Sequence, residues 1–301
     1  MASATEYPAH EFVLSLDCPE RPGIVHAVSG YLLEHGGDIH ELRQFDDFGS
    51  GRFFMRIHFV SRPGEDFPQV ATGAAAELER LRTAFAPLAE THEMQWSLRP
   101  LTEKRRVLVM VSKFGHCLND LLYRSRMGEL PIDIVAVVSN HTDHQSLVEW
   151  HGIDFHHVPV TPDTKPAAET RLLELMDDYD VELVVLARYM QILSDELSRK
   201  LTGKTINIHH SFLPSFKGAK PYHQAHARGV KTVGATAHYV NSELDEGPII
   251  SQQVQDVDHT FSPADLVAAG RDTECKALSN AVKWHCEGRV FLEGNRTVVL
   301  R

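Results

Sequence analysis

The sequence predicts an α/β and α+β protein of two domains, a small βαββαβ unit followed by a larger and mostly parallel α/β unit. Three observations lead to this prediction. The chain has 301 residues, which is long for one hydrophobic core. Residues 11–98 read as four short strands and two helices. From residue 107 onward, continuous apolar strands alternate with helices, a pattern typical of a parallel sheet covered on both faces.

In the first domain, the residues between 52 and 60 alternate cleanly, with Phe53, Met55 and Ile57 on one face. A helix opens after Pro22-Gly23, and Gly36-Gly37 ends it. The complete pattern predicts strands at 11–17, 38–46, 52–60 and 93–98, and a second helix over 67–85. This order is that of a ferredoxin-like sandwich.

The second domain follows a polar linker, residues 98–105, so the predicted domains are 1–97 and 106–301. Its predicted strands are 107–111, 132–139, 155–159, 183–186, 205–208, 234–240 and one that opens at 248. Its predicted helices are 118–126, 144–151, 166–179 and 262–286, with a further helix opened by Pro221. Ligands of such sheets bind beyond the carboxyl ends of the strands, which makes the loops there the first place to look for a site.

Composition excludes several classes of function. The formal net charge is −11, and there is no clustered basic face of the kind that nucleic-acid binding needs. The four cysteines lie far apart, as expected for reduced thiols in a cytoplasm rather than a disulfide framework. Residues 1–10 do not resemble a secretory signal, and no apolar run is long enough to span a membrane. We therefore expect a cytoplasmic protein that binds neither nucleic acid nor membrane.

Three polar residues are the candidate catalytic group. Asn207 and His209 are two residues apart on an extended segment, so they point to the same side at the carboxyl end of a central strand. Asp245 lies in the loop before the strand that opens at residue 248. An amide N–H and a charged imidazole can stabilise an oxyanion, and a carboxylate can orient the imidazole or move a proton. Together they suggest acyl transfer by direct attack.

The motifs around these residues resemble the formyltransferase family, which uses 10-formyltetrahydrofolate. The similar segments are 207–218 (NIHHSFLPSFKG) and 245–250 (DEGPII), and the resemblance covers about residues 105–290. It implies catalytic roles for Asn207, His209 and Asp245. Residues 186–193 (LARYMQIL) are similar to the family's folate-binding loop. The substrate-binding residues implied or expected are Met190, Gln191, Ile192, Leu193, His210, Ser211 and Gly247.

Two departures indicate a branch that hydrolyses the formyl group. The transformylases of this family carry a glycine-rich phosphate loop, where this chain has Lys113 and Phe114, which keep an anion away from the backbone N–H groups. Segments 209–216 (HHSFLPSF) and 219–225 (AKPYHQA) resemble the deformylases. The resemblance implies hydrolysis of 10-formyltetrahydrofolate to formate and tetrahydrofolate, which supplies formate for purine synthesis. The role of His210 is open between handling water and a simple loop position.

The N-terminal segment 17–25 (DCPERPGIV) and Gly37-Asp38-Ile39 resemble an ACT domain, a module that often binds amino acids between paired copies. The resemblance implies a homodimer or homotetramer. It also implies a candidate effector site at Gly23, Gly37 and Asp38, with a purely structural role equally open.

Three alternatives remain open at this point. The first is a metallohydrolase, which is suggested by the histidines near Asp245 at positions 209, 210, 223, 226 and 238. We nevertheless expect no metal and no cofactor. A second alternative is a non-catalytic sensor. The third is a folate-dependent formyltransferase that uses an amine acceptor.

Overall fold

The computed structural model describes residues 9–62, 67, 69–213 and 221–301. It divides the chain into two compact units. The first holds residues up to 103 together with 287–291 and 298–301, and the second holds 104–286 and 292–297. The two units are described separately.

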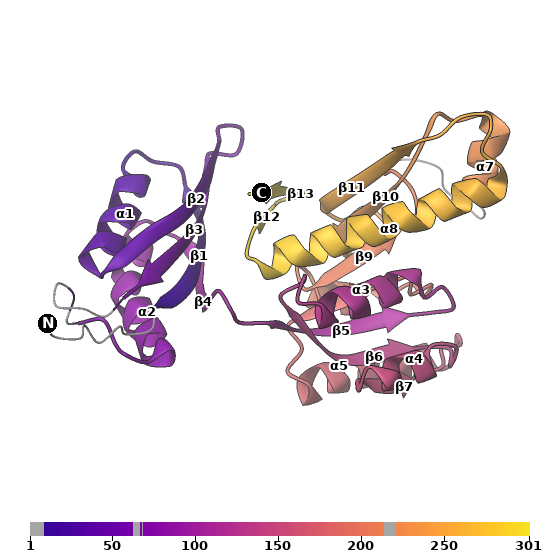
Figure 1. Cartoon of the computed structure of the whole chain (residues 1–301), viewed down its shortest axis with the longest axis horizontal. Coiled ribbons are helices and arrows are strands. Elements are labelled where there is room, and N and C mark those ends of the chain that lie inside the picture. Colours follow the sequence, from indigo (N-terminus) through magenta and orange to yellow (C-terminus); the bar gives the residue numbers. More distant parts are fainter. Residues whose placement is uncertain (1–8, 63–66, 68, 214–220) are drawn as a thin grey trace, which may run out of the picture. The chain divides into compact units, whose positions relative to one another are not determined.

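The first unit is a four-stranded antiparallel sheet in the order β2-β3-β1-β4 (Figure 1). Its elements in chain order are β1 (His10–Pro19), α1 (Ile24–Glu34), β2 (Gly37–Asp47), β3 (Arg52–Ser61), α2 (Ala74–Thr91) and β4 (Gln95–Pro100). The predicted βαββαβ order is therefore confirmed.

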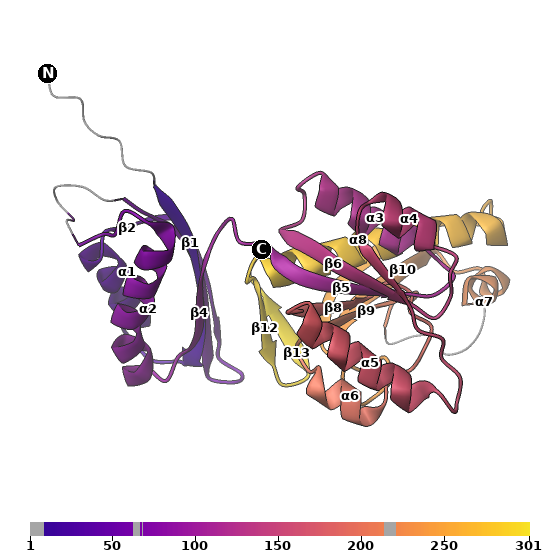
Figure 2. The ribbon, with the colours of Figure 1, turned by 90° about the horizontal axis from the view of Figure 1, so that it is seen from below.

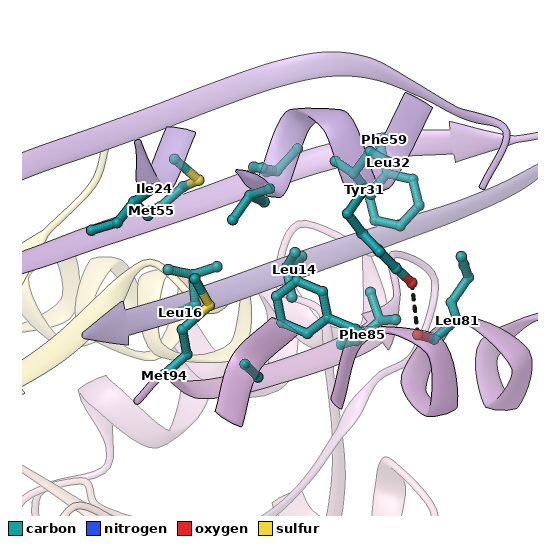
Figure 3. Packing of buried hydrophobic residues seen from close by; sticks show 14 of the residues in the cluster. Leu14, Leu16, Ile24, Tyr31, Leu32, Met55, Phe59, Leu81, Phe85 and Met94 are labelled. Carbon is teal, nitrogen blue, oxygen red and sulfur yellow. Dashed lines mark hydrogen bonds between the residues drawn. The ribbon is translucent and has the colours of Figure 1, made fainter. Parts of the chain in front are cut away.

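Helices α1 and α2 cover one face of this sheet. Their apolar stripes and the alternate residues of the strands form a buried core that includes Leu14, Met55 and Phe85 (Figure 3). The hydroxyl of Tyr31 on α1 donates a hydrogen bond to the carbonyl of Leu81 on α2 at 2.7 Å, so its one polar atom in the core has a partner.

The end of the chain covers residues on the other face of the same sheet. Phe291 and Leu300 pack on Phe54, which points away from Phe53 and Met55 because side chains alternate along β3. The Nε–H of Arg56, a side chain that is 2% exposed, donates to the carbonyl of Glu287 at 2.8 Å. Residues 287–291 and 298–301 thus belong to the first unit, whereas the predicted second domain included them in 106–301.

Among the predicted boundaries that are wrong, two lie in the first unit. Helix α2 begins at Ala74 and continues to Thr91, not 67–85, because the extended backbone of Gly73 delays its start and Pro87 does not end it. The predicted linker also begins too early: β4 continues to Pro100, since Phe12 of β1 still pairs with it there.

The second unit is built on a seven-stranded sheet in the order β11-β10-β9-β8-β5-β6-β7 (Figure 1). The strands from β5 to β9 are parallel, and β10 is antiparallel to both of its neighbours. The strands are β5 (Arg105–Val111), β6 (Ile132–Ser139), β7 (Asp154–His157), β8 (Leu183–Leu186), β9 (Thr205–His209), β10 (Thr232–Tyr239) and β11 (Ile249–Asp256). The predicted Rossmann-like, mostly parallel sheet is confirmed.

Helices cover both faces of this sheet. Figure 2 shows α3 (His116–Arg126), α4 (Gln145–Trp150) and α8 (Pro263–Cys286) on one side, and α5 (Lys165–Asp178) and α6 (Asp195–Lys200) on the other. Leu172 and Leu175 of α5 and Leu197 of α6 pack on the apolar side chains of β5, β6 and β8. The short α7 (Pro221–Arg228) contacts α8.

Three short elements were not predicted: α6 and the hairpin strands β12 (Val290–Glu293) and β13 (Arg296–Val299). Helix α6 begins at the Ser194 hydroxyl, which accepts from the backbone N–H of Leu197 at 3.2 Å. A search of the described residues finds no helix with the length and hydropathy of a membrane span.

Candidate active site

Asn207 and His209 lie at the carboxyl end of β9, near the middle of the large sheet. Asn207 pairs in register with Leu186 of β8 on one side and with His238 of β10 on the other. The chain crosses from β7 back past β5 to form β8, so β8 and β5 flank the point at which the strand order reverses. The site is therefore beside the position where parallel sheets of this kind bind ligands.

Asp245 reaches these two side chains from the loop between β10 and β11. Its Oδ2 lies 3.2 Å from Nδ1 of His209, and its Oδ1 accepts from Nδ2 of Asn207 at 3.5 Å. The loop places Asp245 in the left-handed region at φ 58°, which few non-glycine residues adopt and which Asp tolerates better than most. The three predicted catalytic residues are thus brought together.

Electrostatics keep Asp245 ionised. Burial alone would raise its pKa, but the interactions around the carboxylate, with the hydrogen bond to His209 the largest, outweigh burial and hold the pKa far below the usual range. The carboxylate is therefore negative throughout the ordinary pH range, next to an imidazole that it can orient and stabilise as a cation.

His238 orients the amide of Asn207. Its Nδ1–H donates to the carbonyl of Tyr239 at 2.8 Å, which leaves Nε2 as an acceptor. The Nδ2 of Asn207 lies 3.2 Å from that Nε2, so one amide hydrogen is used there and the other points toward Asp245 and the cavity. His238 is buried on β10, and these two contacts use both of its ring nitrogens.

His210 follows directly, and its ring stacks on that of His209 with the centroids 4.7 Å apart and the planes 29° apart. Burial lowers its pKa to about 4, with further lowering by the positive charges of Arg188 and His209. At neutral pH its imidazole is therefore uncharged, and its lone pair can accept a proton or a hydrogen bond.

These groups face a cavity of about 260 Å³. Most of its lining comes from three stretches: residues 188–193 after β8, 207–210 at the end of β9, and 241–245 before β11. Met190, Ile192 and Leu244 are more than half exposed there (54%, 61% and 61%), which gives the cavity apolar walls beside the polar group. The predicted binding residues Met190, Gln191, Ile192, Leu193 and His210 all line it.

The other two predicted binding residues do not line this cavity. Ser211 is buried, and its hydroxyl has no hydrogen-bond partner. Gly247 lies against the backbone of Tyr239, where a Cβ would collide with the carbonyl group. Both support the loops that form the site. The motif residues 214–220 lie outside the described part of the chain.

The loop after β5 is packed with side chains instead of forming an open anion cradle. A ring nitrogen of His144 donates to the carbonyl of Lys113 at 3.1 Å, and a Cβ on Gly115 would lie 2.8 Å from the other nitrogen of that ring. Phe114 covers the guanidinium of Arg188, which is 5.7 Å from the ring centroid. This arrangement agrees with the loss of the phosphate loop inferred from Lys113 and Phe114.

A buried carboxylate, Glu274, is the main site residue that sequence reasoning missed. It lies on α8 with a side chain that is 2% exposed, and it accepts from a ring nitrogen of His116 at 2.7 Å and from the hydroxyl of Tyr222 at 3.0 Å. The Nε of Arg188 is 3.4 Å away. Burial alone would raise the pKa of Glu274, but His116, Arg188 and Tyr222 together lower it.

One signal in the sequence could have revealed Glu274. It occupies the apolar stripe of α8 together with Leu266, Ala277 and Ala281, all of which are buried. A charged residue in such a stripe needs buried partners, so its position alone marks a polar network.

The described residues contain one group with the geometry to hold a metal ion, formed by His116, Cys117 and Glu274. Their donor atoms lie within 4.8 Å of one another. Both carboxylate oxygens of Glu274 already have hydrogen-bond partners, since one accepts from His116 and the other from Tyr222. Of the histidines that raised a metal site, His223 and His226 are exposed on α7 and do not line the cavity.

In the first unit, local backbone geometry accounts for the predicted effector residues. Gly23 precedes α1 with φ 98°, a conformation that favours glycine. Gly37 begins β2, where a Cβ would lie 3.1 Å from the carbonyl oxygen of Leu32. Asp38 is exposed, and its carboxylate lies 3.6 Å from Nε2 of His40.

Comparison with known proteins agrees with this geometry. Residues 105–282 match the formyl transferase family model. The chain is 65% identical over 289 residues to a formyltetrahydrofolate deformylase from Corynebacterium sp. (strain P-1), an alignment that covers 96% of this chain and 98% of the relative.

Solved structures agree as well. A formyltetrahydrofolate deformylase from Burkholderia mallei superposes with a TM-score of 0.90 at 52% identity and covers 97% of this chain and 100% of that one. A glycinamide ribonucleotide transformylase from Symbiobacterium toebii, at 31% identity and a TM-score of 0.61, covers 66% of this chain and 95% of its own. The similarity to the deformylases extends over nearly the whole chain, so this protein belongs to the formyltetrahydrofolate deformylase family.

Proposed function

We propose that this protein hydrolyses 10-formyltetrahydrofolate to formate and tetrahydrofolate, and that Asn207, His209 and Asp245 are its catalytic residues. The observation that carries the proposal is the position of the Asp245 carboxylate, 3.2 Å from Nδ1 of His209 and 3.5 Å from Nδ2 of Asn207, at the cavity of about 260 Å³. An amide donor and an imidazolium held in this way can stabilise negative charge on a carbonyl oxygen.

The formyl carbonyl binds between Asn207 and His209. As water attacks the formyl carbon, the carbonyl oxygen becomes an oxyanion that accepts from the Asn207 amide and from protonated His209. Asp245 orients the ring of His209 through its Nδ1. The intermediate then collapses, the bond to N10 breaks, and N10 takes a proton, which gives formate and tetrahydrofolate.

The folate binds along Met190, Gln191, Ile192 and Leu193. The flat pteridine suits the apolar walls that Met190, Ile192 and Leu244 provide, while backbone groups of this loop supply the hydrogen bonds that its polar edge needs. The Ser112 hydroxyl supports the loop, because it accepts from the backbone N–H of Met190 at 3.0 Å. Ser211 and Gly247 contribute by supporting the neighbouring segments.

The direct test is to measure formate and tetrahydrofolate released from 10-formyltetrahydrofolate by purified protein. Asn207→Ala, His209→Ala and Asp245→Ala should each lower kcat by about 10²–10³ with an unchanged circular dichroism spectrum. His259→Ala, at an exposed position, is the matched control and should leave kcat unchanged. Wild-type turnover in any of the three site variants, or no formate from the native protein, contradicts the assignment.

Adding small amine acceptors tests the alternative of transfer to an amine. Hydrolysis predicts that formate appears in full and that no formylated amine accumulates. A formylated product in place of formate would make the protein a transferase. A protein that releases neither product would be a sensor.

We further propose that the reaction is cytoplasmic, needs no metal, and supplies formate for purine synthesis. Full activity after treatment with a chelator is expected, and loss of activity that a divalent cation restores contradicts it. The first unit is proposed to pair in a homodimer or homotetramer and to bind an amino-acid effector at Gly23, Gly37 and Asp38. Sedimentation and calorimetry with glycine and methionine test these two points.

A further inference from the structure

His210 is the one histidine at the cavity whose ring nitrogens are both unused. Among the described residues, no side chain or backbone group hydrogen-bonds to either of them, whereas His209 faces Asp245 and His238 is held by Tyr239. The ring stacks on that of His209 and lines the same cavity. A ring in this position can bind a water molecule next to the formyl carbon.

Asp245 is poorly suited to take a proton from that water. Its two oxygens face His209, Asn207 and His238, and its pKa is far below the usual range. The pKa of His210, about 4, is the higher of the two, so the imidazole is the better proton acceptor of the pair. It is unprotonated at neutral pH, as a base must be.

Four charged or titratable groups face His210, and each comes from a different segment. Arg188 after β8 and His209 on β9 disfavour its protonation, while Glu274 on α8 and Asp245 before β11 favour it. Burial has the largest effect, and Arg188 has the largest effect among the charges. Among the charged groups, Arg188 therefore contributes most to keeping His210 an acceptor.

The backbone and the guanidinium of Arg188 each have neighbours that define this position. Its backbone adopts the left-handed region at φ 65°, and its carbonyl accepts from the backbone N–H of Ser112 at 3.2 Å. Its guanidinium lies between the ring of Phe114 and the carboxylate of Glu274. Backbone strain of this kind persists only where the surrounding structure determines it.

Glu274 is fixed in turn from two other helices. His116 of α3 and Tyr222 of α7 each donate to it, and the Tyr222 ring lies across α8 at Gly270, where any Cβ would overlap the ring. This glycine is one turn before Glu274, so the space it leaves lets the hydroxyl of Tyr222 reach the carboxylate.

We propose that His210 is a further catalytic residue, which binds the attacking water and takes its proton, and that Arg188, held by Glu274, is the positioning residue for this ring. The proposal rests on the hydrolytic function proposed above. It explains how a site built for formyl transfer can use water, the acceptor that most needs a base.

In the proposed step, the oxygen of the water forms a bond to the formyl carbon while one of its protons passes to a ring nitrogen of His210. The electron pair of the carbonyl π bond moves to the oxygen, where Asn207 and His209 stabilise it. When the tetrahedral intermediate collapses, the bond from carbon to N10 breaks, and N10 receives a proton from the His210 imidazolium. Formic acid then loses its proton to solvent.

The first experiment compares His210→Gln with the exposed control His259→Gln. Loss of a general base should lower kcat for hydrolysis by about 10²-fold or more, with KM changed less than about threefold and formate release by the control unchanged. Hydroxylamine, a nucleophile stronger than water and less dependent on a base, should still be formylated by His210→Gln at a rate close to that of the wild type.

The outcomes separate this proposal from the proposed function. If His210→Gln hydrolyses at the wild-type rate, or if hydrolysis and hydroxylamine formylation fall equally, His210 is not the base. If the wild-type protein releases no formate, the hydrolytic function itself is wrong.

The second experiment follows kcat against pH for Arg188→Met and Arg188→Lys, with exposed Arg271→Met as the control. Removing the positive charge beside Glu274 raises the pKa of His210, so the acidic limb of the profile should move up by about one pH unit or more. The charge-preserving Arg188→Lys should keep the limb near that of the wild type.

An unmoved limb in Arg188→Met would overturn the positioning role, because a purely structural defect lowers kcat at every pH alike. If Arg188→Met does not fold, NMR titration of the His210 ring in Arg188→Lys and the wild type decides the same question. The titration of His210 should then begin only below about pH 5 in both proteins, and titration near pH 6.5 in the wild type overturns the proposal.

Discussion

Replacing Gly247 by alanine should displace the loop that carries Asp245. The new Cβ would lie 2.9 Å from the carbonyl carbon of Tyr239 and closer still to its oxygen, and 3.3 Å from Nδ1 of His238. Tyr239 cannot move away easily, because its backbone N–H donates a hydrogen bond to the carbonyl of Pro248 at 2.9 Å. Relief of the collision requires the loop to move by about 1 Å, and a displacement of that size at a catalytic group can cost about 10²-fold in rate.

A 10²-fold loss corresponds to about 2.7 kcal/mol in the activation free energy. The assay is kcat for formate release, measured with the thermal midpoint, which should fall by only a few degrees because strain of about 1–3 kcal/mol is local. Gly30→Ala is the control, since nothing lies within 4 Å of the Cβ that it would add. A Gly247→Ala variant with wild-type kcat would refute the argument that this contact positions Asp245.

Three further predictions concern other parts of the molecule. Glu77→Ala should lower the free energy of unfolding of the first unit by about 3–5 kcal/mol, because hydrogen bonds from Arg80 and others outweigh burial and lower the Glu77 pKa. This contribution is present above the ordinary pKa of a glutamate and is lost as pH falls through the folded value, so acid unfolding curves of the two proteins should converge. Burial raises the pKa of Cys18 to about 11, and the neighbouring thiol of Cys275, followed by burial, raises the pKa of Cys117. Both thiols should therefore resist iodoacetamide at pH 8 until the protein is unfolded, as mass spectrometry can show. Ser211→Ala should change KM less than about twofold and cost no stability in denaturant titrations, because the hydroxyl is buried without a partner.

The parts of the fold that the sequence predicted are those with strong local periodicity. The strand at 132–139 matches β6 residue for residue, because Pro131 precedes its largely apolar run and the polar segment 140–143 follows it. Helix α6 was missed because six residues hold too few turns to show a period. The start of α2 was placed too early, since the backbone conformation of Gly73 is not readable from composition.

The same distinction applies to the site. Asn207 and His209 were predictable because the alternation of one strand brings them together, and a motif added Asp245. The network around Glu274 could not be predicted, because its partners His116 and Tyr222 come from helices that are far apart in sequence. The approach of Tyr222 also depends on the space that Gly270 leaves. The participation of residues 287–291 in the first unit likewise depends on tertiary contacts alone.

The return of the chain to the first unit has a consequence for synthesis on the ribosome. The strands of that unit emerge early, but Phe54 and Arg56 receive their cover only when residues 287–300 have left the exit tunnel. The second unit is nearly continuous over 104–286, so its core can fold before the last segments of the first unit have been synthesised. We therefore expect nascent chains arrested shortly after α8 to carry a protease-resistant catalytic unit and a protease-sensitive N-terminal one.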